Sequence, residues 1–390
     1  MIPYGRQNIS DDDIKSVVEV LKSDFLTQGP TVPLFEKKIN ELVGSKYAVA
    51  VNSATSALHS ACLALGVGTD DIVWTSPISF VASANCAIYC GAKVDFIDIN
   101  LKTYNVDIDY LKEKLFQAEK NGTLPKVIIP VHLAGQSCDM ESISKLSVQY
   151  GFKVIEDASH AIGGRYKGEM IGNCKYSDIT VFSFHPVKII TTGEGGVATT
   201  NNPEIYNKLS RLRSHGITRD INEMTHASDG PWYYQQLELG YNYRMTDIQA
   251  ALGISQLTRL EEFIKNRHEI VEKYNQKLNS EYFIKPYQDE STYSSYHLYI
   301  IRFKLDKVKF THKQIFEQLR LAGILVNLHY IPIYKHPFYE KYGNVASQYP
   351  NSEKYYADAM SLPIFPGLKD SQIDEVVHRL THPIGYQTLF

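Results

Sequence analysis

The segment SDITVFSFHPVKIITTGEGGVATTN, residues 177–201, decides the fold. An apolar run ends at Ser183, a loop containing a proline presents Lys188, and glycines lead into a second run rich in β-branched residues. This pattern predicts two strands joined by a loop that carries a lysine. A buried ammonium must be paired or lose its proton. Taken alone, the segment favours the simpler alternative, a lysine whose loop reaches water.

The amine of Lys188 is chemically useful only when it is uncharged. A lysine with the ordinary pKa of about 10.4 has almost no free amine at neutral pH, whereas a Schiff base with a carbonyl group requires that free amine. A cofactor aldehyde held next to Lys188 would need further binding groups elsewhere in the sequence.

Short β-branched runs alternate with helical patterns through the first half of the chain. YAVAV (47–51) predicts a strand, and TSALHSACLALG (55–66) predicts a helix that ends at its glycine. KVIIPV (126–131) and FKVIED (152–157) repeat the strand pattern. Continuous apolar strands that alternate with helices are typical of a mainly parallel sheet covered on both faces. The sequence therefore predicts an α/β fold.

With 390 residues, the chain is too long for one hydrophobic core and suggests two domains. A helical pattern over residues 245–278 predicts one long helix that joins them. Helical stretches around 312–322 and 370–381, without further parallel-strand repetition, predict a small α+β domain. We expect a large domain at 1–250, whose N-terminal segment reaches the substrate cleft, and a small domain at 251–390.

Composition excludes several classes of function. The 40 basic and 43 acidic residues leave a formal charge of −3, which gives no electrostatic reason to bind nucleic acid or a membrane surface. No apolar run approaches the roughly 18 residues of a membrane span, and the N-terminus lacks the pattern of a signal peptide. The five cysteines form no CxxC pair and predict buried free thiols. We expect a cytoplasmic protein without a metal site.

Two further segments place polar groups at the ends of predicted strands. Asp157 lies where ligands bind in open α/β sheets, and its carboxylate could keep the nitrogen of a pyridine ring protonated. NSATSALH (52–59) offers small residues and the N–H groups of a helix start to a phosphate, with the hydroxyls of Ser53 and Thr55 as added donors. An ordinary helix cap explains each segment equally well.

Phe80 ends another predicted strand and could stack on a flat ring, although core packing is the commoner role of such a residue. The glycine patterns GxGxxG and GxxxxGKS/T are absent, which counts against a dinucleotide site or a P-loop. The joint order of a phosphate-binding segment, an aromatic residue, Asp157 and Lys188 is what favours pyridoxal phosphate (PLP) as the ligand.

This order of segments resembles the DegT/StrS-type sugar aminotransferases, a branch of the aspartate-aminotransferase (type I) fold of PLP enzymes. The resemblance covers nearly the whole chain, from about Ile2 to Leu380. It rests on the motifs LTQGP (26–30), NSATSALH (52–59), EDASHA (156–161), SFHPVKIITTGEGG (183–196) and GYNYRMTDIQAALG (240–253). It implies the large and small domains of that fold, PLP as the cofactor, and a homodimer with shared active sites.

The resemblance also implies a role for each residue of the site. Lys188 would hold PLP as a Schiff base, and Asp157 would pair with its ring nitrogen. The other cofactor-binding residues would be Ser53, Ala54, Thr55, Phe80, His160, Ser183 and, from the neighbouring subunit, Asn242. The residues lining the sugar-nucleotide cleft would be Tyr4, Asp24, Phe25, Leu26, Thr27, His329, Tyr330, Ile331 and Pro332.

Within the family, RSHGI (213–217), VNLHYIPIY (326–334) and HPFY (336–339) resemble the branch that serves pseudaminic acid synthesis and flagellin glycosylation. That branch transfers the amino group of L-glutamate to the 4-keto carbon of a UDP-linked 4-keto-6-deoxy-N-acetylhexosamine. The product is UDP-4-amino-4,6-dideoxy-N-acetyl-β-L-altrosamine. His160 stands where many family members have Gln, and it also matches this branch.

Two alternatives stay open at this point. The acceptor could be another 3- or 4-keto sugar linked to GDP or dTDP, or the chain could be a regulatory protein that binds PLP without turnover. The residue that binds the glutamate carboxylate is also open, with Arg213, Arg219 and Arg244 as candidates.

Overall fold

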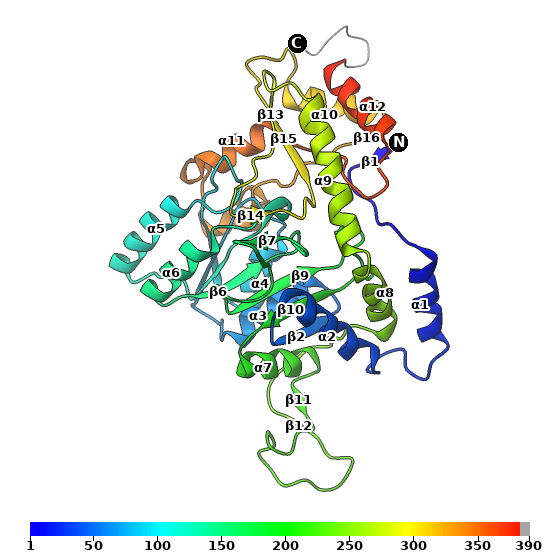
Figure 1. The fold of residues 1–390 in the computed structure, drawn as a ribbon. Helices are drawn as coiled ribbons and strands as arrows, with labels where there is room; N and C mark the ends of the chain where they lie inside the picture. The colour runs from blue at the N-terminus through cyan, green and yellow to red at the C-terminus, as the bar shows by residue number, and fades with distance from the viewer. Residues whose placement is uncertain (383–390) are drawn as a thin grey trace.

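The structure is a computed structural model that describes residues 1–382 (Figure 1). Its centre is a seven-stranded sheet in which all strands but one run parallel. In spatial order the strands are β2 (Tyr47–Val51), β10 (Gly196–Thr200), β9 (Ile179–Ser183), β6 (Lys153–Asp157), β5 (Val127–Ile129), β3 (Ile72–Thr75) and β4 (Lys93–Phe96). Strand β10 is antiparallel to both of its neighbours. The α/β fold predicted from the sequence is confirmed.

Helices cover both faces of this sheet because its strands are apolar on both sides. Val49 and Val51 of β2 belong to the core under one face, while Ala48 and Ala50, which alternate with them, belong to the core under the other. The first core contacts α3 (Ala54–Ala64), α4 (Ala82–Tyr89) and α7 (Pro203–Arg213). The other face is covered by α2 (Thr31–Val43), α5 (Ile108–Asn121), α6 (Met140–Tyr150) and α8 (Asp247–Leu257).

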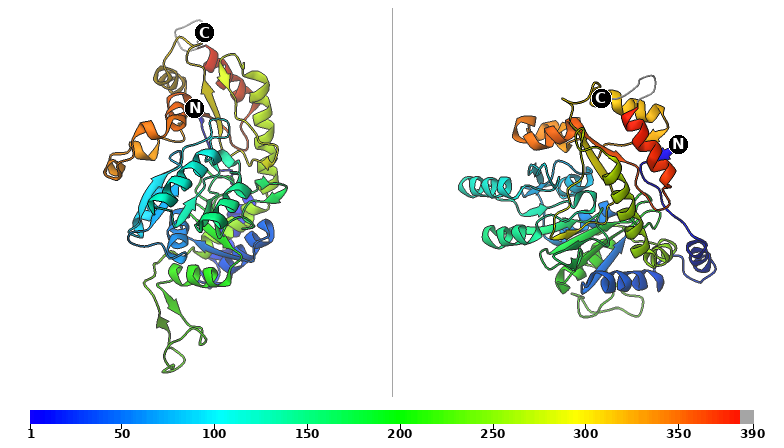
Figure 2. Two further views of the ribbon diagram at one scale, coloured as in Figure 1. Left: turned by 90° about the vertical axis from the view of Figure 1, so that its left-hand side faces the viewer. Right: turned by 45° about the horizontal axis from the view of Figure 1, so that its top comes forward.

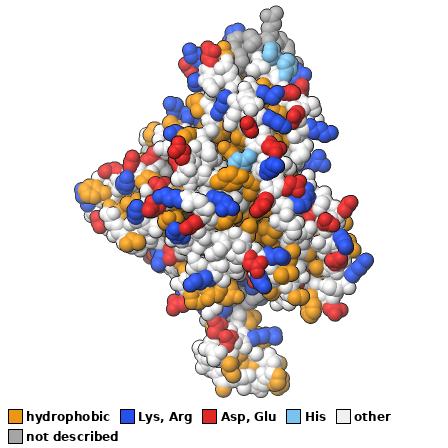
Figure 3. Space-filling model, viewed as in Figure 1, with side chains coloured by type: hydrophobic (Ala, Val, Ile, Leu, Met, Phe, Trp, Pro, Cys, Tyr) orange, Lys and Arg blue, Asp and Glu red, His pale blue; other side chains and the backbone are white. Residues whose placement is uncertain are grey.

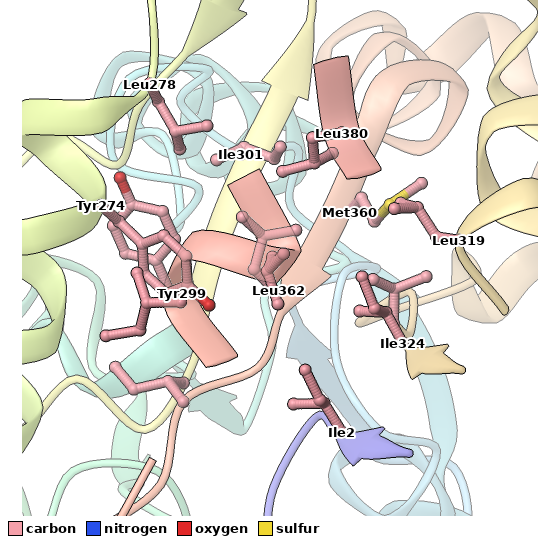
Figure 4. Close-up of a cluster of buried hydrophobic side chains, with 14 of the residues drawn as sticks. Ile2, Tyr274, Leu278, Tyr299, Ile301, Leu319, Ile324, Met360, Leu362 and Leu380 are labelled. Atoms are coloured by element: carbon pink, nitrogen blue, oxygen red, sulfur yellow. The ribbon is translucent and has the colours of Figure 1, made fainter. Parts of the chain in front are cut away.

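A second, antiparallel sheet is built from the C-terminal part of the chain. Its order is β13 (Phe283–Ile284), β15 (Tyr299–Phe303) and β17 (Ala359–Leu362). It packs with α9 (Leu260–Lys277), α10 (His312–Leu321) and α12 (Asp370–Thr381). Figure 4 shows that Ile2 joins this cluster, because β1 (Ile2–Pro3) pairs in parallel with β16 (Ile324–Leu325). The first residues of the chain therefore lie against its C-terminal part.

The single long helix expected over 245–278 is wrong, since two helices, α8 and α9, occupy that stretch. The amide groups of Thr258 and Arg259 bond to carbonyls three residues earlier, those of Ser255 and Gln256. Such bonds tighten the last turn and end α8. The side chain of Arg259 then turns away to the Oδ1 of Asn8, at 2.8 Å. The apolar periodicity continues through this break, which is why the sequence pattern did not reveal it.

The rest of the described chain forms smaller elements. A three-stranded sheet joins β14 (Thr292–Tyr293), β7 (Arg165–Tyr166) and β8 (Glu169–Met170), and α1 (Asp11–Leu21) and α11 (Pro350–Asp358) lie at the periphery. A hairpin of β11 (Ile217–Thr218) and β12 (Gln235–Gln236) projects far from the body (Figures 1 and 2). Ile221 and Trp232, in the loop between these strands, are each 74% exposed, and Figure 3 shows apolar side chains on this projection. No helix within residues 1–382 has the length and apolar character to span a membrane.

A buried carboxylate fixes the loop that precedes α2. The residue before α2 is Pro30, which provides no side-chain cap. Asp247, the first residue of α8, caps this helix although it lies far away in the sequence. Its carboxylate accepts hydrogen bonds from the amides of Gly29 (2.7 Å), Thr31 (2.8 Å) and Val32 (3.0 Å). The amide of Asp247 donates in return to the carbonyl of Leu26. The loop and the start of α8 are thereby held as one unit.

Replacing Asp247 with Ala should lower the free energy of unfolding by roughly 2–4 kcal/mol, because buried amides lose a charged acceptor. Urea unfolding followed by circular dichroism measures this loss. Glu41→Ala is the matched control, since Glu41 on α2 makes only an exposed pair with Lys37 at 3.8 Å. Equal stability of the two variants would contradict the anchoring role of Asp247.

Candidate active site

A cavity of about 900 Å³ opens at the carboxyl ends of β6 and β9. This edge of a parallel sheet is where open α/β folds bind ligands. The predicted site residues that line the cavity are Tyr4, Ser53, Ala54, Thr55, Phe80, Asp157, His160, Ser183, Lys188, His329 and Tyr330. They come from segments far apart in the sequence, and both the central sheet and the 327–330 segment contribute.

The remaining predicted residues do not line this cavity within one chain. Residues 24–27 run beside the start of α8, where Thr27 pairs with Thr246, and the side chains of Phe25 and Leu26 are about half exposed. Ile331 and Pro332 follow the cavity-lining Tyr330 directly. Asn242 is exposed, and its carbonyl accepts a hydrogen bond from the side chain of Asn52 at 3.5 Å.

Lys188 follows β9 in a loop whose turn is closed by its own amide, which donates to the carbonyl of His185 at 2.9 Å. Burial lowers the pKa of Lys188 to about 8, and the negative charge of Asp157 only partly opposes this shift. At neutral pH about a tenth of the Lys188 amine is then uncharged, far more than in an ordinary lysine. The amine is therefore able to condense with an aldehyde.

Asp157 ends β6 and is only 4% exposed. One of its carboxylate oxygens accepts from Ser83 Oγ at 2.6 Å, and the other accepts from the amide of Ser159 at 3.1 Å. Ser83 Oγ lies 2.7 Å from the hydroxyl of Ser79, so a chain of two serines orients the carboxylate. A carboxylate oxygen can accept more than one hydrogen bond, so a protonated ring nitrogen could still bind here.

The N-terminus of α3 forms a cup for an anion. Ser53 caps the helix and its Oγ accepts from the amide of Ser56 at 3.1 Å, which leaves the amides of Ala54 and Thr55 without an acceptor inside the helix. Both residues line the cavity. Gly196 of β10 comes so close that a Cβ there would lie 2.5 Å from the amide nitrogen of Ala54. Only glycine lets β10 pack against this cup.

His160 and His329, two histidines of the cavity, are neutral. Nδ1 of His160 accepts from the amide of Ala134 at 3.3 Å, so Nε2 carries the proton and donates to the hydroxyl of Tyr330 at 3.2 Å. Burial and the nearby amine of Lys188 lower the pKa of His160 well below its ordinary value. The same two causes lower the pKa of His329 to about 3. Lys188 is therefore the group of this set that titrates near neutral pH.

The donor set fits PLP. The uncharged amine of Lys188 suits its aldehyde, Asp157 suits its ring nitrogen, and the free amides of Ala54 and Thr55 suit its phosphate dianion. The Nε2–H of His160 is a donor that could turn to a ring hydroxyl. Phe80 is 59% exposed, and its ring centroid lies 6.1 Å from that of Tyr330. No group of three or more His, Cys, Asp or Glu side chains within residues 1–382 is placed to hold a metal ion.

Sequence reasoning missed several residues of this site. Ser79, Ser83, Glu194, Gln249 and Asn327 also line the cavity. The sequence does carry a signal for Gln249. This residue follows Thr246 by three positions, as in a capping box, and lies inside the motif GYNYRMTDIQAALG (240–253). Its Nε2 donates to the carbonyl of Glu194 at 2.8 Å. Ser79, in the bend before α4, and Ser83, in the first turn of α4, carry no sequence signal, since serines are common in both places.

The three arginines considered for the glutamate carboxylate lie elsewhere. Arg213 pairs with Glu36, Arg219 lies over the ring of Tyr234, and Arg244 donates to the hydroxyl of Ser214 at 3.4 Å. None of them lines the cavity formed by the described residues.

Comparisons with known proteins agree with this geometry. The model of the DegT/DnrJ/EryC1/StrS aminotransferase family matches residues 7–381. The chain is 40% identical over 380 residues to a UDP-4-amino-4,6-dideoxy-N-acetyl-beta-L-altrosamine transaminase of Campylobacter jejuni serotype O:2, covering 95% of each chain. It is 38% identical over 379 residues to the spore coat polysaccharide biosynthesis protein SpsC of Bacillus subtilis, covering 96% of this chain and 95% of SpsC.

Solved structures show the same fold. Helicobacter pylori PseC, an aminotransferase involved in the biosynthesis of pseudoaminic acid, superposes with a TM-score of 0.88 at 31% identity, covering 97% of this chain and 98% of PseC. Spr1654 of Streptococcus pneumoniae, solved in a PLP form, gives a TM-score of 0.86 at 29% identity and covers 97% of both chains.

The depressed pKa of Lys188 predicts how the cofactor-free protein captures PLP. Only the unprotonated amine condenses, so the rate of covalent capture should rise with pH through a midpoint of about 8. Protein stability should also rise from that pH towards the ordinary lysine value, because the unfolded chain there binds the extra proton. Stopped-flow absorbance measures the capture rate, with Lys188→Ala as the control that forms no covalent product. A midpoint near the ordinary lysine pKa would contradict the effect of burial.

Ser83→Ala removes the 2.6 Å hydrogen bond to Asp157 and should lower kcat by roughly tenfold, since a carboxylate loses one of the donors that orient it. Ser79→Ala should have a smaller effect, because that hydroxyl reaches Asp157 only through Ser83. Steady-state kinetics of both variants at one pH shows which substitution lowers kcat more. Ser60→Ala, a buried serine on α3 without a hydrogen-bond partner, is the control. A larger loss in Ser79→Ala than in Ser83→Ala would refute the serine chain.

Proposed function

Given that the chain belongs to the DegT/DnrJ/EryC1/StrS aminotransferase family and is a sugar aminotransferase, we propose that it transfers the amino group of L-glutamate to a nucleotide-linked keto sugar. The acceptor is a UDP-linked 4-keto-6-deoxy-N-acetylhexosamine, and PLP is the cofactor. The product is UDP-4-amino-4,6-dideoxy-N-acetyl-β-L-altrosamine, a precursor of pseudaminic acid.

The observation that carries this proposal is the convergence of Lys188 and Asp157 on one cavity. Asp157 reaches it from the end of β6, Lys188 reaches it from the loop after the adjacent strand β9, and the start of α3 supplies an anion site beside them. Each feature alone has an ordinary structural explanation. A desolvated amine, a buried carboxylate and free helix amides on one cavity together match the three chemical groups of PLP.

We assign the cofactor contacts as follows. Lys188 holds the aldehyde carbon, Asp157 the ring nitrogen, and the phosphate is held by the amides of Ala54 and Thr55. The hydroxyls of Ser53, Thr55 and Ser183, the ring of Phe80 and the Nε2–H of His160 complete the set. When bound, PLP supplies an electron sink that lets an amino group leave one carbon and join another.

The chain's own residues provide proton transfer and charge. The amine of Lys188, once released, takes a proton from the α-carbon of glutamate and returns one at the sugar carbon. A pKa of about 8 suits both directions, because neither protonation state is rare near neutral pH. The Nε2–H of His160 donates to the hydroxyl of Tyr330 at the wall of the cavity.

The relatives support the identity of the acceptor sugar. The C. jejuni protein is named for this altrosamine product, and PseC is described as acting in pseudoaminic acid biosynthesis. Tyr4, His329 and Tyr330 line the cavity where the sugar would meet Lys188. Residues 24–27 and 331–332 would contact the more distant nucleotide. In this proposal the site lies between a large domain, 1–250, and a small domain, 251–390, of which residues 383–390 lie outside the described part of the chain.

The active enzyme is proposed to be a homodimer with shared sites. Asn242 is exposed in one chain, and no arginine among the described residues lines the cavity to bind the carboxylates of glutamate. A second copy of the chain would supply Asn242 to the phosphate and the missing cation to the donor. The projecting hairpin, with Ile221 and Trp232 exposed, offers apolar surface for such an assembly.

The proposed reaction predicts two half-reactions through one site. With PLP, L-glutamate and the UDP-linked 4-keto sugar, initial-rate plots should be parallel and NMR should identify the 4-amino sugar. Lys188→Ala should lower turnover by at least about a thousandfold, because its amine is both the anchor and the base. Intersecting plots would contradict the shared site.

A panel of GDP- and dTDP-linked 3- and 4-keto sugars serves as the control for the acceptor. Faster turnover of one of these would reassign the substrate without changing the chemistry. Absence of any spectral change with glutamate would favour a regulatory PLP-binding protein instead.

A further inference from the structure

Three of the five cysteines gather between α3 and α4, and none of them lines the cavity. Cys62 lies on α3, Cys86 lies on α4, and Cys90 follows α4 directly. The side chain of Cys62 interacts with the side chains of both Cys86 and Cys90. The two helices pack against each other, and all three cysteines belong to or pack against the same core cluster.

The three thiols differ in their access to solvent. Cys62 and Cys86 are fully buried, while Cys90 is partly exposed. Cys86 donates to the carbonyl of Ser83, and Cys90 donates to the carbonyl of Cys86, each at 3.3 Å. A small solute can therefore reach Cys90 first, and the buried thiol of Cys62 is its neighbour on the other helix.

The surroundings also give the thiols of Cys62 and Cys90 different pKa values. His59 lies one turn before Cys62 on α3, and its ring packs at 4.9 Å from that of Tyr241 and at 5.3 Å from that of Tyr89. The thiol of Cys62 and the imidazole of His59 lower the pKa of Cys90 to about 6, against the effect of burial. Its neighbours and burial raise the pKa of Cys62 well above the ordinary value. One partner is thus a nucleophile and the other a protonated thiol.

We propose that Cys90 and Cys62 form a peroxide-reactive pair, in which hydrogen peroxide or an organic hydroperoxide oxidises Cys90 and Cys62 closes the disulfide. The Cys90 thiolate attacks one oxygen of the peroxide and breaks the O–O bond, which gives a sulfenic acid. The leaving oxygen takes up a proton and departs as water from hydrogen peroxide or as an alcohol from an organic hydroperoxide. The Cys62 thiol then attacks the Cys90 sulfur, and its proton leaves with the hydroxyl as water. Two thiols lose two electrons in total, and the peroxide takes them up.

The position of the pair within the fold connects it to the active site. The cup that holds the proposed phosphate is the N-terminus of α3, and Ser83, which orients Asp157, belongs to α4. A Cys62–Cys90 bond would therefore join the two helices that carry these groups. The inference itself does not depend on which sugar the enzyme uses.

The test is a disulfide map of the PLP-loaded full-length protein after treatment with hydrogen peroxide. Free thiols are blocked with iodoacetamide, and the unreduced protein is digested with chymotrypsin. Trypsin is unsuitable, because no Lys or Arg occurs between Lys46 and Lys93 and all three cysteines would share one peptide. Chymotrypsin cleavage after Trp74, Phe80 and Tyr89 separates them. Mass spectrometry should then find the Cys62 and Cys90 peptides joined.

Variants distinguish this pair from general oxidation. Cys90→Ser should abolish the disulfide, and Cys62→Ser should leave a Cys90 sulfenic acid that dimedone captures. Cys138→Ser is the matched control and should form the disulfide normally, because Cys138 is buried elsewhere and donates to the carbonyl of Val131. In the untreated protein, iodoacetamide should modify Cys90 about tenfold faster than Cys138 at neutral pH. A disulfide that includes Cys86, or a map with Cys62 and Cys90 unchanged, would overturn the proposal.

Discussion

The structure depends on the withdrawal of one lysine amine from water. Burial lowers the pKa of Lys188 to about 8 although the carboxylate of Asp157 acts in the opposite direction. The desolvation of the amine outweighs the attraction between the two charges, and the amine remains reactive as a result.

The sheet brings the two residues to one edge, because Asp157 ends β6 and the loop that carries Lys188 follows the adjacent parallel strand β9. Successive side chains of a strand point to opposite faces. Asp157 therefore faces the cavity, whereas Glu156 points to the other side and is bound by His132 at 2.7 Å and by Thr180 at 3.1 Å. That buried network holds the end of β6 from behind. Ser83 of α4 holds the carboxylate from the front, so Asp157 is fixed on both sides.

The sequence predicted those parts of the site in which a polar, charged or small residue stands at the end of an apolar strand or next to one. A lysine between two apolar strands, an aspartate at a strand end and a run of small residues before a helix all meet at the cavity. It did not predict Ser79 and Ser83, because a buried serine in a bend or a helix has many roles. The break between α8 and α9 was also missed, since the hydrogen bonds of Thr258 and Arg259 end the helix without disturbing its apolar periodicity. The contact of Asn242 with a second chain follows only from the family resemblance. Such contacts depend on the shape of two surfaces, which the pattern of residues in one chain does not reveal.

A crystal structure of the protein grown with PLP tests the central claim most directly. The account predicts continuous electron density between Nζ of Lys188 and the aldehyde carbon of the cofactor, with a carboxylate oxygen of Asp157 in hydrogen-bonding contact with the ring nitrogen. It also predicts the phosphate at the amides of Ala54 and Thr55. Cofactor density elsewhere, or a Lys188 side chain that points away from the cavity with Asp157 bound only to protein, would contradict it.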